Sequence, residues 1–332
     1  MPLEGYVCPP GGEKPGRKNA VEYCLSQCAQ PCVTPPLLAA MWKSDTENYH
    51  QGDYISASML AGSGCMRQTY LERFEGFHDL PTKRYWPFRG THAHKIVEEA
   101  GDILAPYGWL QEIRLSTTMT FPDLPAPLFA DSGEFAGTFD FDRPLQVVIR
   151  GTCDAYNPVR SELVDCKSMA DTKVQMMIEG SSPGTYSRHL QDNWIAQLNI
   201  YRWLISKTPV PDDIRAELLG HGLPPLEGEY YPAPEKLYIQ GIAMMSHPVS
   251  GSKLAHKVKG KKVQVYNIDS VPVWSLEDIE AYLRPLALKW YKALNLRRMP
   301  KPIGVDKKWM CPNCAFYKDK CNPEEYWNGK AN

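Results

Sequence analysis

The sequence lacks the features that mark a membrane protein, a secreted protein or a strongly basic protein. It has no run of the roughly 18 consecutive apolar residues that a membrane span requires. Its first segment, MPLEGYVCPP, has neither the basic start nor the apolar core of a secretion signal. Lysine and arginine number 37 against 38 aspartates and glutamates, so the formal net charge is −1. We therefore expect a cytoplasmic protein with no membrane contact. A wholly basic polyanion binder is excluded, although a local basic groove stays open.

Cysteine, by contrast, is abundant. The chain has 332 residues, of which 43% are hydrophobic and 23% charged, as in ordinary globular proteins. This length suits one large domain or two smaller ones of roughly 150 residues each. Ten of the residues are cysteines, and most of them are clustered. In the reducing compartment that we expect here, clustered cysteines favour metal binding over disulfides.

The hydrophobic patterns divide the chain unevenly. Residues 1–50 are rich in proline and glycine without periodicity, so we interpret them as an N-terminal appendage. One main domain at 51–325 and a short tail at 326–332 follow. The main domain alternates helical and strand patterns, which predicts an α/β (α+β) fold with a mixed central sheet flanked by helices.

The expected elements of the main domain follow from periodicity and composition. Helices are expected at 56–76, 89–106, 187–206 and 275–298. Strands are expected at 109–121, 137–141, 145–156, 161–168, 236–245 and 262–269. The proline-rich residues 207–235 are expected to form a loop.

The segment RGTCDAYNPVRSELVDCKSM, at 150–169, carries the strongest chemical signal. It predicts two neighbouring strands joined by a turn near Asn157, with Asp154 near the end of the first strand. Asp165 and Lys167 lie two residues apart on the second strand and so share one face. Two carboxylates about 4 Å apart repel by roughly 4 kcal/mol at an effective dielectric near 20, which favours a bound Mg²⁺ or Mn²⁺. The alternative is a half-buried hairpin with one exposed salt bridge.

Other motifs flank this segment in a fixed order. In chain order the motifs are Gly90-x-x-x-His94, Gly151-x-x-Asp154, Asp165-x-Lys167 and Gln197-x-x-x-Tyr201. Each motif alone is weak, since a histidine on a helix is usually structural and glutamine and tyrosine are common on helix surfaces. Their order resembles the PD-(D/E)XK nuclease superfamily, and specifically its RecB-type branch. The resemblance covers roughly residues 55–325 and therefore implies a PD-(D/E)XK nuclease core.

The resemblance also implies a role for each motif residue. The implied metal ligands are His94, Asp154, Asp165 and the backbone carbonyl of Cys166. The implied catalytic lysine is Lys167, and the supporting pair that positions it or the DNA strand is Gln197 and Tyr201. Glu112 falls where many relatives carry a glutamate on the first strand, and we give it a minor role.

Three cysteines near the C-terminus have the spacing of a metal site. Cys311-x₂-Cys314-x₆-Cys321 needs a fourth thiolate to close, and Cys65 is the candidate. One upstream cysteine with three C-terminal ones resembles the iron–sulfur nucleases of the same branch. These include the CRISPR adaptation-associated nuclease, AddB-type nuclease domains and phage exonucleases. The resemblance implies a [4Fe–4S] cluster that staples the two ends of the core, and Zn²⁺ in the same four-cysteine site is the alternative.

A second cysteine group lies in residues 1–50, which the resemblance does not cover. Its members are Cys8, Cys24, Cys28 and Cys32. The last three are spaced to lie along one side of a helix, but Pro31 indicates that a helix would end there. Two interpretations stay open, namely a Zn²⁺ site and free cysteines in a small packed appendage.

Positive charge is concentrated in two places. One run, between the last two predicted strands, includes Lys257, Lys259, Lys261 and Lys262. The other, before the C-terminal cysteines, includes Arg297 and Arg298. Such runs are usually solvated faces, but these two could also track a DNA phosphate backbone.

Taken with the resemblance, these features predict a metal-dependent DNA nuclease. We expect an exonuclease that acts on single strands or DNA ends, in phage DNA processing, recombination, repair or CRISPR adaptation, within a bacterial or phage-infected cell. The chain has no G-x-x-x-x-G-K-[ST] motif, so a helicase would be a separate partner. A recombinase or a CRISPR adaptation protein is a further expected partner. The alternatives are an inactive DNA-binding or assembly module with the same fold, and a zinc protein in which the D-x-K pattern is accidental.

Overall fold

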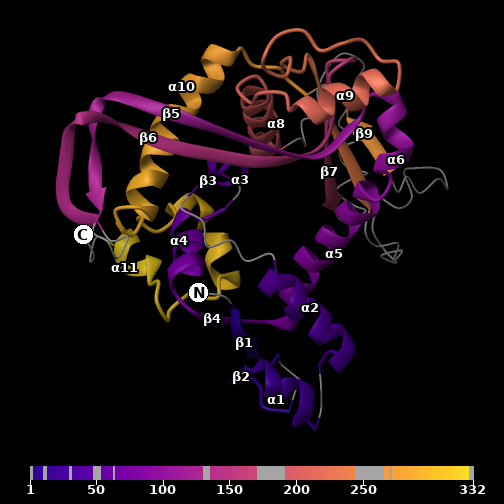
Figure 1. Cartoon of the computed structure of the whole chain (residues 1–332). Coiled ribbons are helices and arrows are strands. Elements are labelled where there is room, and N and C mark those ends of the chain that lie inside the picture. The colour runs from indigo at the N-terminus through magenta and orange to yellow at the C-terminus, as the bar shows by residue number, and fades with distance from the viewer. Residues whose placement is uncertain are drawn as a thin grey trace. The chain divides into compact units, whose positions relative to one another are not determined.

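A computed structural model describes residues 3–9, 13–29, 32–47, 54–62, 64–129, 135–169, 191–243, 265–268 and 271–328. The chain folds into two compact units, each assembled from segments that are distant in sequence. Unit 1 combines Met1–Asp53, Gly64–Thr91 and Tyr291–Asn332, and unit 2 combines Tyr54–Ser63 and His92–Trp290. Figure 1 labels the elements of both units.

Unit 1 is built around a three-stranded sheet in the order β2-β1-β4. Its strands are β1 (Leu3–Val7), β2 (Lys18–Ala20) and β4 (Phe77–Asp79). Its helices are α1 (Val21–Ser26), α2 (Pro35–Glu47), α4 (Met66–Phe74), the first part of α5 (Pro81–Glu98), the 3₁₀ helix η2 (Val305–Asn313) and α11 (Pro323–Trp327). Leu3 and Tyr6 of β1 share a buried core with Leu71, Phe77 and Phe316.

The division into units differs from the predicted split at residue 50. The first residues do not stand apart, because β1 pairs antiparallel with β2 and parallel with β4. The C-terminal Phe316 packs on Phe77 of β4, with ring centroids 5.4 Å apart. These contacts join positions far apart in the chain, so they leave no periodic signal within residues 1–50.

Unit 2 contains a six-stranded mixed sheet in the order β3-β6-β7-β8-β9, with β5 also paired to β6. The strands are β3 (Ile55–Ser56), β5 (Leu110–Phe129), β6 (Phe135–Asn157), β7 (Glu162–Met169), β8 (Lys236–Ala243) and β9 (Val265–Ile268). The helices are α3 (Ala57–Leu60), α6 (Gly101–Leu104), the 3₁₀ helix η1 (Ala105–Tyr107), α8 (Asp192–Ile205), α9 (Asp212–Gly220) and most of α10 (Leu276–Leu294).

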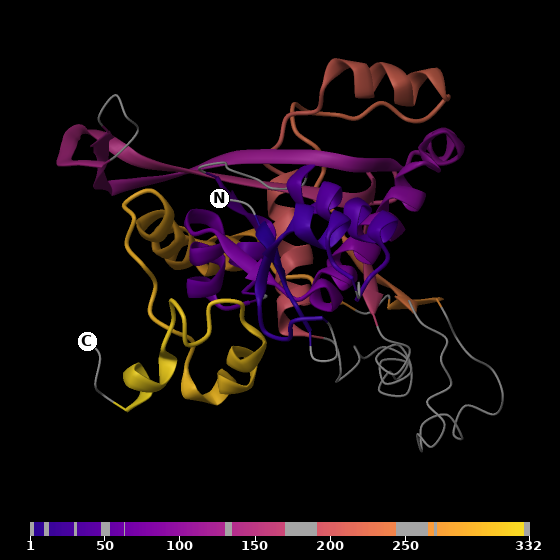
Figure 2. The ribbon, with the colours of Figure 1, turned by 90° about the horizontal axis from the view of Figure 1, so that it is seen from below.

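The sheet is mixed because parallel and antiparallel neighbours alternate across it. β7 runs antiparallel to β6 and parallel to β8, and β8 runs antiparallel to β9. Helix α8 packs against β5, β6 and β7. The long β5–β6 pair forms a two-stranded ribbon that Figure 1 and Figure 2 show from two directions. The predicted mixed α/β class is confirmed at this level.

Several predicted element boundaries are wrong. The helix expected at 56–76 is two helices, α3 and α4, separated where Gly62 adopts a left-handed φ of 73°. Helix α5 begins at Pro81 rather than near residue 89, because proline suits the first turn of a helix. The strands expected at 137–141 and 145–156 are one strand, β6.

The predicted loop at 207–235 is also wrong, because it contains helix α9. Pro211 directly precedes this helix, and Asp212 and Asp213 lie in its first turn, where carboxylates offset the positive end of the helix dipole. Leu218 is its buried anchor. None of the described helices combines the length and apolar character that crossing a membrane would require.

Candidate active site

The predicted hairpin at 150–169 is confirmed as the antiparallel pair β6–β7. Ala155, Tyr156 and Asn157 pair with Val164, Leu163 and Glu162. Asn157 is fully buried and fixes the turn. Its amide donates to the carbonyl of Tyr107 (3.0 Å), and its Oδ1 accepts from the backbone N–H of Arg160 (3.0 Å).

This hairpin brings Asp154 beside the second strand. The Oδ2 atom of Asp154 accepts a hydrogen bond from the backbone N–H of Cys166, at 2.6 Å. Asp165 and Lys167 lie on either side of Cys166. Asp154 on β6 therefore lies next to Asp165 and Lys167 on β7, as the strand pattern predicts.

A continuous chain of polar contacts runs from β7 to α8. The Nζ of Lys167 lies 2.8 Å from Oδ2 of Asp165, which is 3% exposed. The same Nζ donates to Oε1 of Gln197 at 3.0 Å. Gln197 in turn donates through Nε2 to the hydroxyl of Tyr201, one helical turn along α8, at 3.0 Å. One ion pair and two hydrogen bonds thus join four of the motif residues.

The donors and acceptors of the neighbouring side chains fix the orientation of the Gln197 amide. A lysine ammonium has donors but no acceptor, so the oxygen of the Gln197 amide must face it. The Gln197 nitrogen then faces the Tyr201 hydroxyl. Burial, followed by the negative charge of Asp165, holds the pKa of Tyr201 well above its ordinary value. The tyrosine therefore stays neutral and the lysine position is set by two oxygens.

The glycine of the G-x-x-D motif lies where α3 and α8 leave no room for a side chain. A Cβ atom at Gly151 would lie 2.8 Å from Cε1 of Tyr201 and 3.2 Å from Cβ of Ala57. It would also lie 3.3 Å from Cδ1 of Leu204. Glycine inside a strand often marks such a close approach, and this is the signal that could have predicted the contact.

Glu112 lies on β5, beside the strand that carries Asp154. The β5–β6 register, in which Gln111 faces Ala155 and Ile113 faces Cys153, places Glu112 opposite Asp154. Its φ is 48°, a left-handed value that is uncommon for a residue other than glycine and costs energy. Such strained residues cluster at functional sites.

Three carboxylates influence the thiol of Cys166. Burial comes first, and then the negative charges of Asp154 and Asp165, with a smaller effect of Glu112; together they raise its pKa to about 12. Lys167 acts in the opposite direction. Negative charge from three neighbouring strands is thus concentrated at one place, and carboxylate oxygens are the donors that Mg²⁺ and Mn²⁺ prefer.

The remaining predicted ligands are less defined. His94 lies within α5, and its side chain is outside the described part of the structure. The role of the Cys166 carbonyl stays a prediction. Among the described residues, no three histidine, cysteine, aspartate or glutamate side chains already form a group that would hold a metal ion.

The four cysteines of the predicted cluster line one hollow in unit 1. Cys65, Cys311, Cys314 and Cys321 surround it together with apolar residues such as Leu71, Pro302 and Ile303. Its empty volume is about 370 Å³, part of it open to solvent. Burial raises the pKa of Cys314 to about 11, and the neighbouring sulfurs of Cys65 and Cys321 act in the same direction.

Local backbone geometry holds these cysteines in place. Cys65 is the residue before the first turn of α4, and its carbonyl accepts from the N–H of Thr69 at 3.1 Å. Cys314 donates its N–H to the Cys311 carbonyl (2.9 Å), and Cys321 donates its N–H to the Phe316 carbonyl (2.9 Å). Phe316 is buried in the core of unit 1, so it anchors the C-terminal loop.

Two further sets of predicted residues are the N-terminal cysteine group and the basic runs. Cys8, Cys24, Cys28 and Cys32 lie around β1, β2 and α1. Arg297 stacks over the ring of Phe74, 3.7 Å from its centroid, and Arg298 is exposed. The lysines predicted to bind DNA, Lys257, Lys259, Lys261 and Lys262, lie outside the described residues.

Comparison with known proteins adds little. No family model and no curated protein matches the chain. One similar solved structure is the crystal structure of SSO0001, at 14% identity and a TM-score of 0.41, over 86% of this chain and 94% of that chain. A likeness this weak carries no argument about fold or activity, so the function must be inferred from the site.

Proposed function

We propose that unit 2 is a metal-dependent DNA nuclease with a PD-(D/E)XK core. The observation that carries the proposal is the continuous set of polar contacts from Asp165 through Lys167 and Gln197 to Tyr201, with Asp154 on the adjoining strand. An accidental D-x-K pair on a solvated hairpin would not require a buried aspartate or a matching glutamine and tyrosine on a separate helix.

The site would bind one or more Mg²⁺ or Mn²⁺ ions through oxygen ligands. Asp154, Asp165 and Glu112 would supply carboxylates, and His94 with the Cys166 carbonyl would complete the set. A bound divalent ion lowers the pKa of a coordinated water and stabilises the charge that develops on a phosphoryl group.

Lys167 would act directly on the reacting phosphate. Among the described residues, its ammonium forms an ion pair with Asp165 and donates a hydrogen bond to Gln197. A further donor of the ammonium suits the attacking water or a non-bridging phosphate oxygen, where positive charge stabilises the transition state. Gln197 and Tyr201 would be positioning residues, because they act through the lysine.

A [4Fe–4S] cluster in unit 1 is the second part of the proposal. The hollow in unit 1 brings Cys65 and the three C-terminal cysteines to one place, which supports a site with four thiolate ligands. Four thiolates suit such a cluster, which would link α4 to the C-terminal loop as a structural staple.

We further propose a substrate and setting for the enzyme. It would act as an exonuclease on single strands or DNA ends, in the cytoplasm of a bacterial or phage-infected cell, and serve DNA processing, recombination, repair or CRISPR adaptation. Arg298 and the basic segment that includes Lys257, Lys259, Lys261 and Lys262 would contact the phosphate backbone. A helicase, a recombinase or a CRISPR adaptation protein would be its partner.

The direct test is a cleavage assay on anaerobically purified full-length protein. End-labelled single- and double-stranded DNA would be incubated with Mg²⁺, Mn²⁺ or EDTA. We expect cleavage that requires the metal and that is lost in Asp165→Ala. Glu162→Ala is the matched control, because Glu162 lies on the same strand and also contacts a lysine, Lys236, at 3.3 Å.

The outcomes separate the competing functions. Metal-dependent cleavage by the parent and by Glu162→Ala, but not by Asp165→Ala, would support the nuclease. Folded protein that binds DNA without cutting it under any of these conditions would contradict the proposal. That result would favour the inactive DNA-binding module.

A further inference from the structure

The N-terminal cysteine group lies in a part of unit 1 that the proposed nuclease chemistry does not use. Cys8 directly follows β1, and Cys24 lies within α1, which begins where β2 ends. Cys28 and Cys32 follow α1 on the way to α2. The end of one strand, one short helix and the connection after it therefore bring the four thiols to the same substructure.

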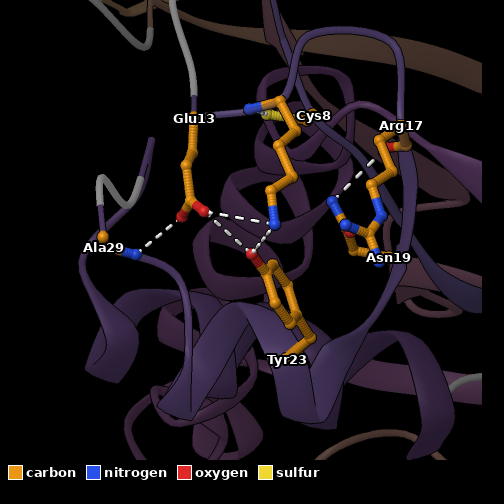
Figure 3. Close-up of polar contacts among 7 residues, drawn as sticks. Cys8, Glu13, Arg17, Asn19, Tyr23 and Ala29 are labelled. Carbon is orange, nitrogen blue, oxygen red and sulfur yellow. Dashed lines mark hydrogen bonds and ion pairs between the residues drawn. The ribbon is translucent and has the colours of Figure 1, made fainter.

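Glu13 draws the first and last parts of this substructure together. Its carboxylate accepts hydrogen bonds from the backbone N–H of Ala29 (2.7 Å) and from the hydroxyl of Tyr23 (3.0 Å), as Figure 3 shows. Cys28 precedes Ala29, and its backbone N–H donates to the carbonyl of Tyr23 at 3.0 Å. Lys14, which follows Glu13, donates its backbone N–H to Sγ of Cys8 at 3.4 Å. Two adjacent residues, Glu13 and Lys14, thus contact both the segment that contains Cys28 and the sulfur of Cys8.

The four sulfurs lie close enough to influence one another. Burial raises the pKa of Cys24 to about 11, and the sulfurs of Cys28, Cys32 and Cys8 add to the rise.

This substructure also has very little core of its own. Among the described residues of 3–32, the buried apolar side chains are Leu3, Tyr6 and Val21. Segments this small usually need a disulfide or a metal ion in addition to their apolar contacts. All four cysteines are reduced in the structure.

We propose that Cys8, Cys24, Cys28 and Cys32 form a structural Zn²⁺ site. Four thiolates make a closed tetrahedral site with Zn–S distances of about 2.3 Å, which leaves no position for substrate. The described side chains do not yet form a metal-holding group, so the sulfurs would close around the ion as it binds. The ion would join the β1–β2 hairpin to α1 and to the chain that enters α2. This proposal does not depend on the nuclease activity.

The test measures the metals of the full-length protein, purified anaerobically, by inductively coupled plasma mass spectrometry. The parent, Cys32→Ser and Cys314→Ser would be compared. Cys32 is exposed, so its replacement should not disturb packing. We expect one zinc per chain in the parent and in Cys314→Ser, and loss of that zinc in Cys32→Ser. Iron should show the opposite pattern, with retention in Cys32→Ser and loss in Cys314→Ser.

A second measurement covers the case in which a variant fails to fold. The parent would be stripped of zinc and titrated with Co²⁺, whose visible spectrum reports tetrahedral thiolate ligation. One equivalent bound with that spectrum supports the proposal. Parent protein with no zinc, no such spectrum and four readily titrated N-terminal thiols would overturn it. Additional iron in place of zinc would overturn it as well.

Discussion

At the scale of single residues, Gly151 is the position where size is most constrained. It lies on β6, three residues before Asp154, against the ring of Tyr201. The ring in turn holds Gln197 through its hydroxyl. A side chain at Gly151 would therefore affect Lys167 through two intermediate residues, Tyr201 and Gln197.

We expect Gly151→Ala to impair both folding and cleavage. The new methyl group would force Tyr201 to move, at a cost of about 1–3 kcal/mol in unfolding free energy, which is typical of overpacking. Urea unfolding and the DNA cleavage assay would measure the two effects. Gly220→Ala is the matched control, because a Cβ there meets nothing within 4 Å. Equal behaviour of the two variants would refute the steric account.

The sequence predicts contacts within one strand of the site better than contacts between a strand and a helix. The spacing of Asp165 and Lys167 on a strand puts both on one face, and the structure joins them directly. The contact of Gly151 with Tyr201 links a strand to a helix some fifty positions further along the chain. The local pattern around either residue does not identify the other one as its contact partner.

At the scale of elements, α8 is the helix that positions the supporting pair. Asn199 lies on this helix and is fully buried. Its amide nitrogen donates to the carbonyls of Ile195 and Pro272, and its oxygen accepts from the N–H of Trp274, all within 2.9 Å. Arg202 adds a bond from Nε to the carbonyl of Pro234 at 2.8 Å. The helix is thus fixed to the segments before β8 and α10.

Asn199→Ala should destabilise unit 2 without removing any proposed catalytic group. The backbone groups of Pro272 and Trp274 would lose a buried partner, and each such loss costs about 1–3 kcal/mol. Chemical denaturation would measure the change against Asn193→Ala, the same substitution at a half-buried position of the same helix. A change no larger than that of the control would show that these hydrogen bonds do not hold the helix.

Element boundaries depend on local chemistry more than on periodicity. The capping pair Ser275 and Asp278 predicts the start of α10, and Ser275 Oγ accepts from the Asp278 N–H at 3.0 Å. The sequence also carries a signal for the break between α3 and α4, because Gly62 and Gly64 interrupt the apolar pattern there. The break depends on Gly62, whose left-handed φ ends the first helix.

At the scale of the whole molecule, the sequence predicts the mixed α/β class but not the way the chain is divided. Unit 1 gathers segments from the start, the middle and the end of the chain. The pairing of β1 with β4 and the burial of Phe316 beside Phe77 produce this grouping. Both are long-range contacts, which hydrophobic periodicity within one segment cannot show.

The central claim is that Lys167 acts on the scissile phosphate. The most direct test compares Lys167→Ala with Lys236→Ala, which removes the lysine of the other pair that involves β7. Cleavage rates would be measured at saturating DNA and Mg²⁺ or Mn²⁺, with DNA binding and thermal unfolding measured alongside. We predict a loss of roughly 10²- to 10⁴-fold in cleavage for Lys167→Ala alone, with binding and folding retained. Equal cleavage by Lys167→Ala and the parent would contradict the mechanism.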